Sequence, residues 1–283
     1  MEPYIYGKVY GILSGDSLII HFSSESQLGD KIVSLEHLVA PKFGSINGQI
    51  QDEAFGYDSW DYLRTLAIGK EVFIPASYKL SQNYRTHPSF GTLYIIFGRL
   101  FFADTNQDIG LLMTKAGWTK LRPYSFLNEY DKQLLDVQKQ AQEKRIGIWG
   151  NNGFIRNLPV HYNSNDLLFQ GEFDANVESI INGTSFCLFL LPKHELIKFY
   201  VAGCSAPSIK AEKNSKYSKE SKKIIIAHFL HRKVHIRLFS SCGNSSFIGS
   251  FIDNHNDIII QLISLGFAKY FRYNSEHVPC SDE

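Results

Sequence analysis

The stretch Asp108-Ile-Gly-Leu-Leu-Met-Thr-Lys-Ala-Gly-Trp-Thr-Lys120 recurs 149 residues later as Asp257-Ile-Ile-Ile-Gln-Leu-Ile-Ser-Leu-Gly-Phe-Ala-Lys269. Each copy predicts a short amphipathic helix with an aspartate N-cap and a glycine after its last turn. In each copy an aromatic residue then begins an extended segment. The chain therefore contains the same helix and strand unit twice.

Four further matches follow the same order along the chain. They are Ser14-Gly-Asp-Ser-Leu-Ile-Ile with Asn182-Gly-Thr-Ser-Phe-Cys-Leu, Val39-Ala-Pro with Ser205-Ala-Pro, Lys70-Glu-Val-Phe-Ile with Arg232-Lys-Val-His-Ile, and Phe90-Gly-Thr with Ile248-Gly-Ser. Five collinear matches predict a tandem duplication of one domain.

Both copies predict the same order of elements. Alternating apolar residues and glycine turns predict strands over 7–12, 17–22, 31–39, 71–74 and 90–97, with counterparts such as 234–239 and 247–252. Helices are predicted over 52–66, 217–230 and 127–144, the last closing on Ile146-Gly-Ile-Trp149. Strands of this kind with inserted and flanking helices predict an α+β fold of two tandem OB-fold β-barrels.

The predicted domain borders follow from the repeat. Domain 1 covers 1–150, an Asn-rich linker with a proline covers 151–166, and domain 2 covers 167–283. Domain 2 is expected to lack the long C-terminal helix of domain 1.

Composition bounds the class of protein but not its function. The 283 residues carry a formal net charge of +1, and 44% are hydrophobic. Four cysteines without a CxxC pair, with neither a signal peptide nor a membrane-length apolar run, predict reduced thiols in a cytoplasmic protein, with a nuclear location as the alternative. We expect no association with membranes.

These motifs resemble the staphylococcal nuclease family. The residues that carry the resemblance are Gly15-Asp16-Ser17, Leu38-Val39-Ala40-Pro41, Phe90-Gly91-Thr92-Leu93-Tyr94 and Gly147-Ile148-Trp149. The second copy is most similar to the subfamily of tandem Tudor staphylococcal nuclease proteins. That resemblance implies RNA binding and a role in RNA silencing, RNA decay, splicing or transcriptional coactivation, with protein partners in a ribonucleoprotein complex.

The resemblance also implies a catalytic set that this chain has largely replaced. Family members that cut nucleic acid use Ca²⁺ held by carboxylates, a glutamate that acts on water and two arginines that bind phosphate. In copy one these positions are Asp16, Val39, Lys42, Ser34 and Phe90, and in copy two they are Thr184, Ser205, Ser208, Tyr200 and Ile248. Of these ten positions, only Asp16 still has the type of side chain that the family uses there. We expect it to be a turn residue whose side chain hydrogen-bonds to its own backbone. We therefore expect no catalytic residue, no metal site, and no cofactor unless residual Ca²⁺-dependent cleavage exists.

Other side chains favour structural roles. The cluster His228, His231 and His235 spans the end of a helix and the start of a strand, so we expect surface histidines rather than metal ligands. We expect Trp149 to anchor the core rather than to stack on a base.

A basic segment is the clearest candidate for binding nucleic acid. From Ser205 to Ser240 there are nine lysines and arginines against two glutamates. The preferred residues are Lys216, Lys219, Lys222, Lys223, Arg232, Lys233 and Arg237, with Lys210 and Lys213 as neighbours on the same expected helical face. In copy one, Lys79, Arg85 and His87 are predicted in a long polar loop with Tyr78 and Tyr84, which suits RNA or an ordinary surface loop equally well.

Three functions remain open from the sequence. They are an RNA-binding module without cleavage, a weak phosphodiesterase that acts on RNA or DNA, and a scaffold for protein partners.

Overall fold

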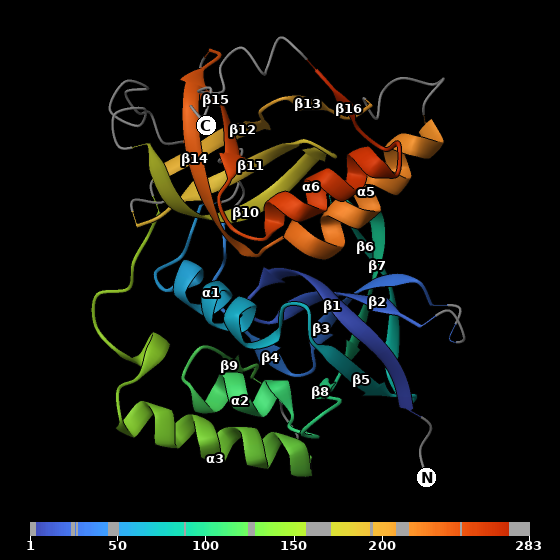
Figure 1. Cartoon of the computed structure of the whole chain (residues 1–283). Coiled ribbons are helices and arrows are strands. Elements are labelled where there is room, and N and C mark those ends of the chain that lie inside the picture. Colours follow the sequence, from blue (N-terminus) through green and yellow to red (C-terminus); the bar gives the residue numbers. More distant parts are fainter. Residues whose placement is uncertain are drawn as a thin grey trace. The chain divides into compact units, whose positions relative to one another are not determined.

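The computed structural model describes residues 4–23, 26, 28–44, 51–87, 89–123, 128–156, 171–192, 195–207, 215–243 and 245–271. The chain divides into two compact units, Met1–Leu158 (unit 1) and Pro159–Glu283 (unit 2), labelled along the chain in Figure 1. The division falls inside the segment that the sequence predicts as the linker. No helix among the described residues is long and apolar enough to cross a membrane.

Unit 1 is built on a strongly curved sheet. Its described strands are β1 (Tyr4–Ser14), β2 (Ser17–Phe22), β3 (Asp30–Leu35), β4 (Leu38–Val39), β5 (Glu71–Pro75), β6 (Lys79–His87), β7 (Gly91–Gly98), β8 (Phe101–Phe102) and β9 (Lys120–Leu121). Seven of them form one sheet in the order β6-β7-β3-β2-β1-β5-β8, in which β3 and β7 run parallel. The strands β4 and β9 form a separate pair.

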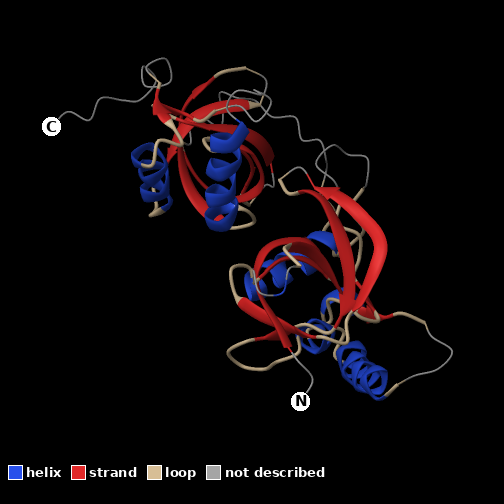
Figure 2. Ribbon diagram, turned by 90° about the vertical axis from the view of Figure 1, so that its right-hand side faces the viewer, coloured by secondary structure: helices blue, strands red, loops and turns tan. Residues whose placement is uncertain are grey.

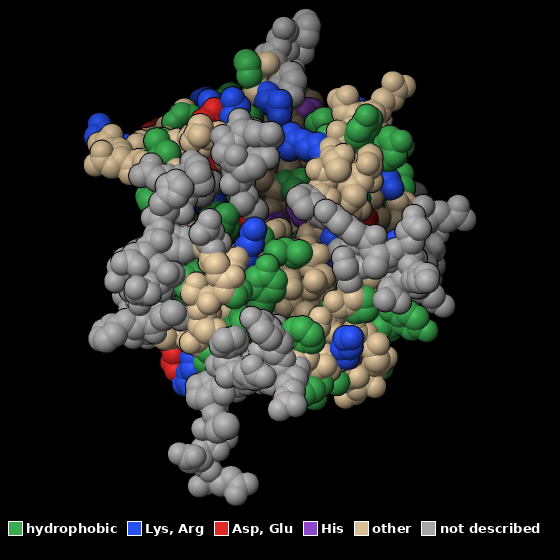
Figure 3. Space-filling view, turned by 90° about the horizontal axis from the view of Figure 1, so that it is seen from above, with side chains coloured by type: hydrophobic (Ala, Val, Ile, Leu, Met, Phe, Trp, Pro, Cys, Tyr) green, Lys and Arg blue, Asp and Glu red, His purple; other side chains and the backbone are tan. Residues whose placement is uncertain are grey.

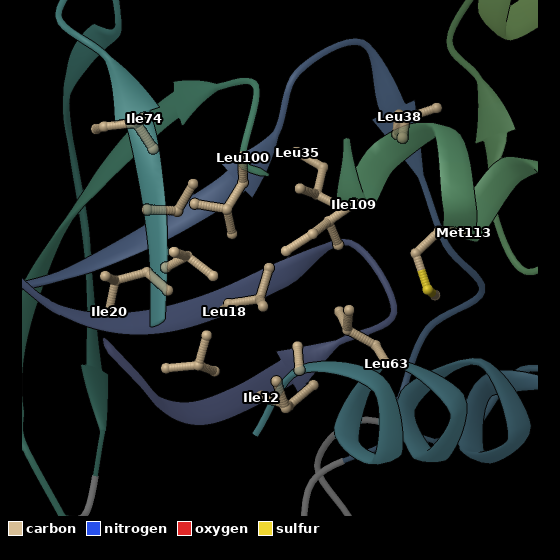
Figure 4. Packing of buried hydrophobic residues seen from close by; sticks show 14 of the residues in the cluster. Ile12, Leu18, Ile20, Leu35, Leu38, Leu63, Ile74, Leu100, Ile109 and Met113 are labelled. Carbon is tan, nitrogen blue, oxygen red and sulfur yellow. The ribbon is translucent and has the colours of Figure 1, made fainter. Parts of the chain in front are cut away.

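The core of unit 1 follows from alternation along these strands. Ile12, Leu18 and Ile20 point inward from β1 and β2, toward Ile74 of β5 (Figure 4). Residues two apart along a strand share a face, so this pattern gives the inner face of the sheet an apolar core. A second, smaller buried cluster of Ile19, Ile32, Leu93 and Ile95 lies apart from it. Helices α1 (Gly56–Ala67) and α2 (Ile109–Lys115) close the core with side chains such as Leu63 and Met113.

Local capping fixes the helices of unit 1. The carboxylate of Asp108 accepts a hydrogen bond from the backbone N of Leu111, as predicted for the N-cap of α2. Asn128 and Asp131 form a capping box at the start of α3 (Glu129–Glu143). A 3₁₀ turn, Gly147–Trp149, follows α3, and its Trp149 is only half-buried and lies outside the buried core, which corrects the expected anchor role.

Unit 2 repeats this plan as a closed barrel. Its described strands are β10 (Glu172–Asn182), β11 (Ser185–Leu190), β12 (Glu195–Val201), β13 (Cys204–Ser205), β14 (Lys233–Ser241), β15 (Ser246–Phe251) and β16 (Lys269–Tyr270), with helices α5 (Ser215–Phe229) and α6 (His255–Ser264). The barrel order is β10-β11-β12-β15-β14, and Figure 2 shows strands of both units curving with helices beside them. The predicted α+β fold of β-barrels with helices is confirmed.

Strand register shows how the two units correspond. The β1–β2 pairing shifts register between Val9 and Gly11, and the β10–β11 pairing shifts between Val177 and Ser179, each 168 residues further along the chain. A Cβ on Gly15 would lie 1.8 Å from Oγ of Ser59, and a Cβ on Gly183 would lie 2.0 Å from Oγ of Ser221. The same close approach of turn to helix therefore occurs in both units.

Register also corrects one predicted match. Backbone N of Glu36 donates to the carbonyl of Gly98, and backbone N of Ala202 donates to that of Gly249. Gly249 therefore corresponds to Gly98, and Ile248 corresponds to Phe97 rather than to Phe90. The sequence match was misleading because the β6–β7 hairpin of unit 1 is longer than the β14–β15 hairpin.

Three local predictions also need correction. The strand expected over 31–39 is interrupted at His37, whose φ of 65° turns the chain between β3 and β4. The polar loop expected around Lys79 and Arg85 is the strand β6, paired with β7. Helix α6 begins at His255 after an Asn254 N-cap, so Asp257 lies in its first turn rather than at its cap.

Candidate nucleic-acid interface

The only retained carboxylate of the family set, Asp16, lies in the tight turn between β1 and β2. Its Oδ1 accepts hydrogen bonds from Oγ of Ser14 at 2.5 Å and from Oγ of Ser17 at 3.3 Å. The side chain is buried. Neighbouring hydroxyls, rather than the backbone that the sequence predicts, therefore hold this carboxylate in place.

A guanidinium lies beside Asp16. Nη2 of Arg122 is 3.9 Å from Oδ2 of Asp16, and Nε of Arg122 donates to the carbonyl of Leu38 at 2.8 Å. The backbone N of Arg122 also donates to the carbonyl of His37, which extends the β4–β9 pairing by one bond. A protein cation thus faces the carboxylate that a divalent metal would need.

A second group of charges lies on the loop after β4. Nζ of Lys42 is 3.5 Å from Oε1 of Glu53, and the backbone N of Lys42 donates to Oε2 of Glu53 at 3.0 Å. The backbone hydrogen bond from Lys42, together with the charges of Lys42 and Lys120, holds the pKa of Glu53 below its ordinary value. Lys120 is exposed and pairs across the strands with Val39.

The remaining catalytic positions of unit 1 carry no charge. Ser34 is buried on β3 opposite Ser17, and Val39 is half-buried on β4. Phe90 is half-buried and packs 5.3 Å from the ring of His87, measured between ring centroids. No guanidinium therefore stands at either phosphate-binding position.

In unit 2 the same turn carries no ion pair. Thr184 replaces Asp16, and its Oγ1 accepts a hydrogen bond from the backbone N of Ala206 at 3.0 Å. Phe271 occupies the place of Arg122, because its backbone N donates to the carbonyl of Gly203 as that of Arg122 does to His37.

The other catalytic positions of unit 2 also hold neither a carboxylate nor an arginine. Tyr200 is half-buried on β12, Ser205 pairs across the strands with Lys269, and Ser208 lies outside the described residues. Ile248 is buried in the barrel, in line with its corrected match to Phe97. Within the described part of the chain, no three His, Cys, Asp or Glu side chains are grouped as metal ligands.

The predicted lysine face of α5 is only partly described. Lys219 is exposed, and Lys223 is exposed with its Nζ 3.2 Å from Oε1 of Glu220. Lys222 is half-buried, and burial lowers the pKa of its ammonium. The side chain of Lys216, like Lys210 and Lys213, lies outside the described residues.

The basic residues on β14 pair with acidic residues on β10. Nζ of Lys233 lies 2.7 Å from Oδ2 of Asp174, and the guanidinium of Arg237 binds Glu172 with Nε at 2.8 Å. His235 lies between the same two carboxylates. Arg232 donates to the carbonyl of Leu230. Strand pairing therefore neutralises much of the positive charge that the sequence suggests.

The β6–β7 hairpin separates its aromatic and basic side chains. Arg85 pairs opposite Leu93, whereas Tyr84 pairs opposite Tyr94. Directly opposed residues share a face, and successive residues alternate, so Arg85 and Tyr84 lie on opposite faces. Lys79 shares the face of Arg85 and lies 3.8 Å from Glu36, while Tyr78 is half-buried against the core. The predicted interleaving of tyrosines and cations is therefore not one surface.

The face of the molecule seen in Figure 3 carries side chains of several kinds. In Figure 3 the lysine and arginine side chains on the face shown are scattered among hydrophobic and other side chains. His228 is exposed and bonds to the carbonyl of Ile224, whereas His231 is buried, so the three predicted surface histidines differ in environment.

Sequence reasoning did not identify Arg122, Lys120 or Glu53. The sequence offered no signal for Arg122, since it stands 106 positions after Asp16 and one residue beyond a two-residue strand. Lys120 could have been found, because it lies at the end of the repeated stretch and aligns with Lys269.

A buried ion pair fixes the segment that follows the 3₁₀ turn. Nε and Nη2 of Arg156 bind the two oxygens of Asp52 at 2.7 and 2.8 Å, and both side chains are almost fully buried. The guanidinium lies 3.9 Å from the ring centroid of Phe43. The first residues of the predicted linker therefore pack on the loop that carries Lys42.

The chain is similar to known proteins over most of its length. The family described as "Staphylococcal nuclease homologue" matches residues 32–151. "Ribonuclease TUDOR 1" of Arabidopsis thaliana is 30% identical over 231 residues, covering 74% of this chain and 22% of that protein. "Staphylococcal nuclease domain-containing protein 1" is 24% identical in both Drosophila melanogaster and Schizosaccharomyces pombe, covering 93% and 95% of this chain. The chain spans between 22% and 32% of the length of these relatives.

Proposed function

Since this chain is a staphylococcal nuclease-like protein of the Tudor-SN type, we propose that it binds RNA and does not cut it. Binding of this kind would serve RNA processing, with RNA silencing and transcriptional coactivation as the finer assignments that the resemblance implies. We propose a cytoplasmic location, with the nucleus as the alternative.

The change of charge at the catalytic positions of unit 1 is the observation that supports this proposal. A calcium site needs several oxygen ligands, whereas here a single carboxylate faces the guanidinium of Arg122. The neighbouring Lys42 and Lys120 are exposed on the same β4–β9 region. Cations of this kind bind phosphates directly, because they replace the counterions that nucleic acid releases.

Binding of labelled RNA to a filter across a salt series tests the proposal. We expect binding at low salt that weakens steadily as salt rises, because phosphate contacts dominate such binding. A chain that retains no RNA at low salt would contradict it.

A second candidate function is weak cleavage of phosphodiesters, since a relative carries the name ribonuclease. Labelled RNA and DNA should be incubated with Ca²⁺, with EDTA as the control. Cleavage that needs the metal and is lost in Asp16→Ala would replace our proposal with this one.

The third candidate, a scaffold for protein partners, is separable by charge-reversal variants of exposed lysines. A scaffold predicts partner binding that survives Lys219→Glu and Lys42→Glu, in a chain that never binds RNA. We propose that any protein partners belong to a ribonucleoprotein complex and that RNA is the primary ligand.

A further inference from the structure

A row of aromatic rings lies on the outer face of unit 1, where β1 and β5 run side by side (Figure 1). Tyr4 and Tyr6 of β1 are 50% and 52% exposed. Their ring centroids lie 4.8 and 5.6 Å from that of Phe73 on β5. Phe73 in turn stacks on Phe101 of β8 at 5.2 Å, whereas its neighbour Ile74 points the other way, into the core (Figure 4). The two tyrosines are therefore the exposed members of an aromatic cluster that lies outside that core.

The corresponding face of unit 2 shows that the fold does not require these rings. Glu172 and Asp174 stand at the positions of the two tyrosines, because the β1–β2 and β10–β11 pairings share their register at an offset of 168 residues. Nε of Arg237 donates to Oε1 of Glu172 at 2.8 Å, and Nδ1 of His235 lies 2.9 Å from Oδ1 of Asp174. Ion pairs therefore suffice at this place in the barrel, and packing alone does not explain two half-exposed tyrosines there.

The spacing of the two tyrosines suits the bases of an unpaired strand. Residues two apart on one β-strand share a face and are about 6.6 Å apart. Successive nucleotides of a stacked strand are only about 3.4 Å apart, so a strand with one base on each ring has those bases separated from one another. A single strand allows this, because its bases can be splayed out and stacked on aromatic side chains. In a duplex the faces of the bases are already covered by their neighbours.

The charges around the rings leave stacking as the main source of affinity. Opposite charges lie close together on this part of unit 1. They are Lys8 directly opposite Glu71, Arg99 with Asp108 at 2.9 Å, and His21 with Asp30 at 2.6 Å. Phosphate contacts therefore add little at this face. A base stacked on an aromatic side chain contributes substantial affinity without them and tolerates any sequence, because every base has a flat π-face.

We propose that the face formed by Tyr4 and Tyr6 binds single-stranded RNA, with one base stacked on each ring. The proposal rests on the proposed function, since RNA is the ligand in both. It adds a second surface, on β1 and β5 rather than on β4 and β9, and it makes the unpaired strand the preferred form of the ligand.

Fluorescence anisotropy with a labelled, unstructured RNA of about 12 nucleotides tests the proposal on the full chain. The double variant Tyr4→Thr, Tyr6→Thr removes both rings but keeps the charge and the strand propensity. We expect its affinity for the single strand to be about 10-fold weaker or worse. The slope of log K against log salt should stay unchanged, because stacking releases no counterions.

Three comparisons separate the rings from other effects of the substitutions. The variant Tyr4→Phe, Tyr6→Phe keeps both rings and should bind as the wild type does. A duplex of the same RNA with its complement should bind the wild type and the threonine variant equally. Urea unfolding followed by tryptophan fluorescence shows whether unit 1 is folded in each variant, and the single variants replace the double variant if it is not.

The matched control is Tyr84→Thr, Tyr94→Thr, which removes two other exposed tyrosines of unit 1. These residues lie directly opposite each other on β6 and β7, and their rings meet edge to face at 6.1 Å between centroids. They do not offer two separate faces to successive bases, so we expect this control to bind as the wild type does.

The surface is overturned, with the proposed function intact, if the wild type binds RNA and the threonine variant of Tyr4 and Tyr6 binds it equally well. Equal losses for the duplex, or in the control, would overturn it too. A wild type that binds no RNA at low salt would remove both proposals. Ring NMR signals of Tyr4 and Tyr6 that shift with protein concentration and not with RNA would instead assign this face to a contact between copies of the chain.

Discussion

Nη2 of Arg122 lies 3.9 Å from Oδ2 of Asp16, and the two corresponding positions of unit 2 hold Phe271 and Thr184. Both charges are therefore present in one unit and both are absent in the other. In unit 2 a hydroxyl that accepts from the backbone of Ala206 stabilises the turn instead. The two residues of this ion pair are therefore replaced together between the two units.

Replacing Asp16 and Arg122 of unit 1 by the residues at the corresponding positions of unit 2 tests that relationship. We expect Asp16→Thr and Arg122→Phe each to lower the free energy of unfolding, and the double variant to lower it by less than their sum. The expected coupling is about 0.5–1 kcal/mol, because Arg122 is half-exposed and water screens the pair. Urea unfolding followed by tryptophan fluorescence reports unit 1 alone, since Trp60, Trp118 and Trp149 all lie there. Strictly additive effects would contradict the relationship.

The buried pair of Arg156 and Asp52 should be the most sensitive ion pair of unit 1. We expect Arg156→Ala to cost about 3–5 kcal/mol, because it leaves a buried carboxylate without its partner. The double variant Asp52→Leu with Arg156→Met should cost far less, since no charge is then buried. Lys42→Ala, which removes an exposed partner of Glu53, is the control and should cost less than about 1 kcal/mol.

The same pair predicts how the stability of unit 1 depends on pH. Burial alone would raise the pKa of the Asp52 carboxyl, but hydrogen bonds from Arg156 and Gly44 and the charge of Arg156 hold that pKa below its ordinary value. The resulting stabilisation is fully present above the unfolded-state value of about 3.9 and is lost as pH falls through the lower folded-state value. Between pH 5 and pH 2 the wild type should therefore lose stability more steeply than the Asp52→Leu, Arg156→Met variant. If the free energies of unfolding of the two proteins fell in parallel with pH, other carboxylates would account for the acid sensitivity of unit 1.

The two turn glycines should respond alike to an added methyl group. A Cβ on Gly15 or on Gly183 would overlap Oγ of Ser59 or of Ser221, at 1.8 and 2.0 Å. We expect Gly15→Ala and Gly183→Ala each to cost about 1–3 kcal/mol through overpacking. Only Gly15→Ala should shift the fluorescence transition, whereas circular dichroism should reveal Gly183→Ala. Gly29→Ala is no suitable control despite its open surroundings, because its φ of +60° is itself unfavourable for alanine.

Local chemistry made some elements of this fold predictable. The N-cap of Asp108 and the left-handed glycines Gly117 and Gly266 follow from short-range rules, and the structure contains all three. The strand β6 was missed because nearly all its side chains are exposed and polar, so it carries no period-two apolar signal. It forms a strand because it pairs with β7.

The site was less predictable because its partners meet only through the fold. Arg122 reaches Asp16 through the β4–β9 pairing, and Arg156 reaches Asp52 from a segment that reads as a linker. The match of Ile248 to Phe90 failed because hairpins of different length carry similar Gly-containing motifs. Long-range pairing decides such positions, and sequence spacing does not report it.

The cations around the catalytic positions of unit 1 should contribute to RNA affinity through phosphate contacts. We expect the combined change of Lys42, Lys120 and Arg122 to glutamine to lower the slope of log K against log salt by about 2, taking about 0.7 per phosphate contact on single strands. A control with the same change in net charge replaces Lys144, Lys233 and Arg237 by glutamine. It should alter the slope little, because Lys233 and Arg237 bind Asp174 and Glu172 at 2.7 and 2.8 Å, closer than the 3.5 and 3.9 Å that separate Lys42 from Glu53 and Arg122 from Asp16. Equal slopes for the two triple variants would show that RNA responds to net charge alone and would remove the catalytic positions of unit 1 from the binding surface.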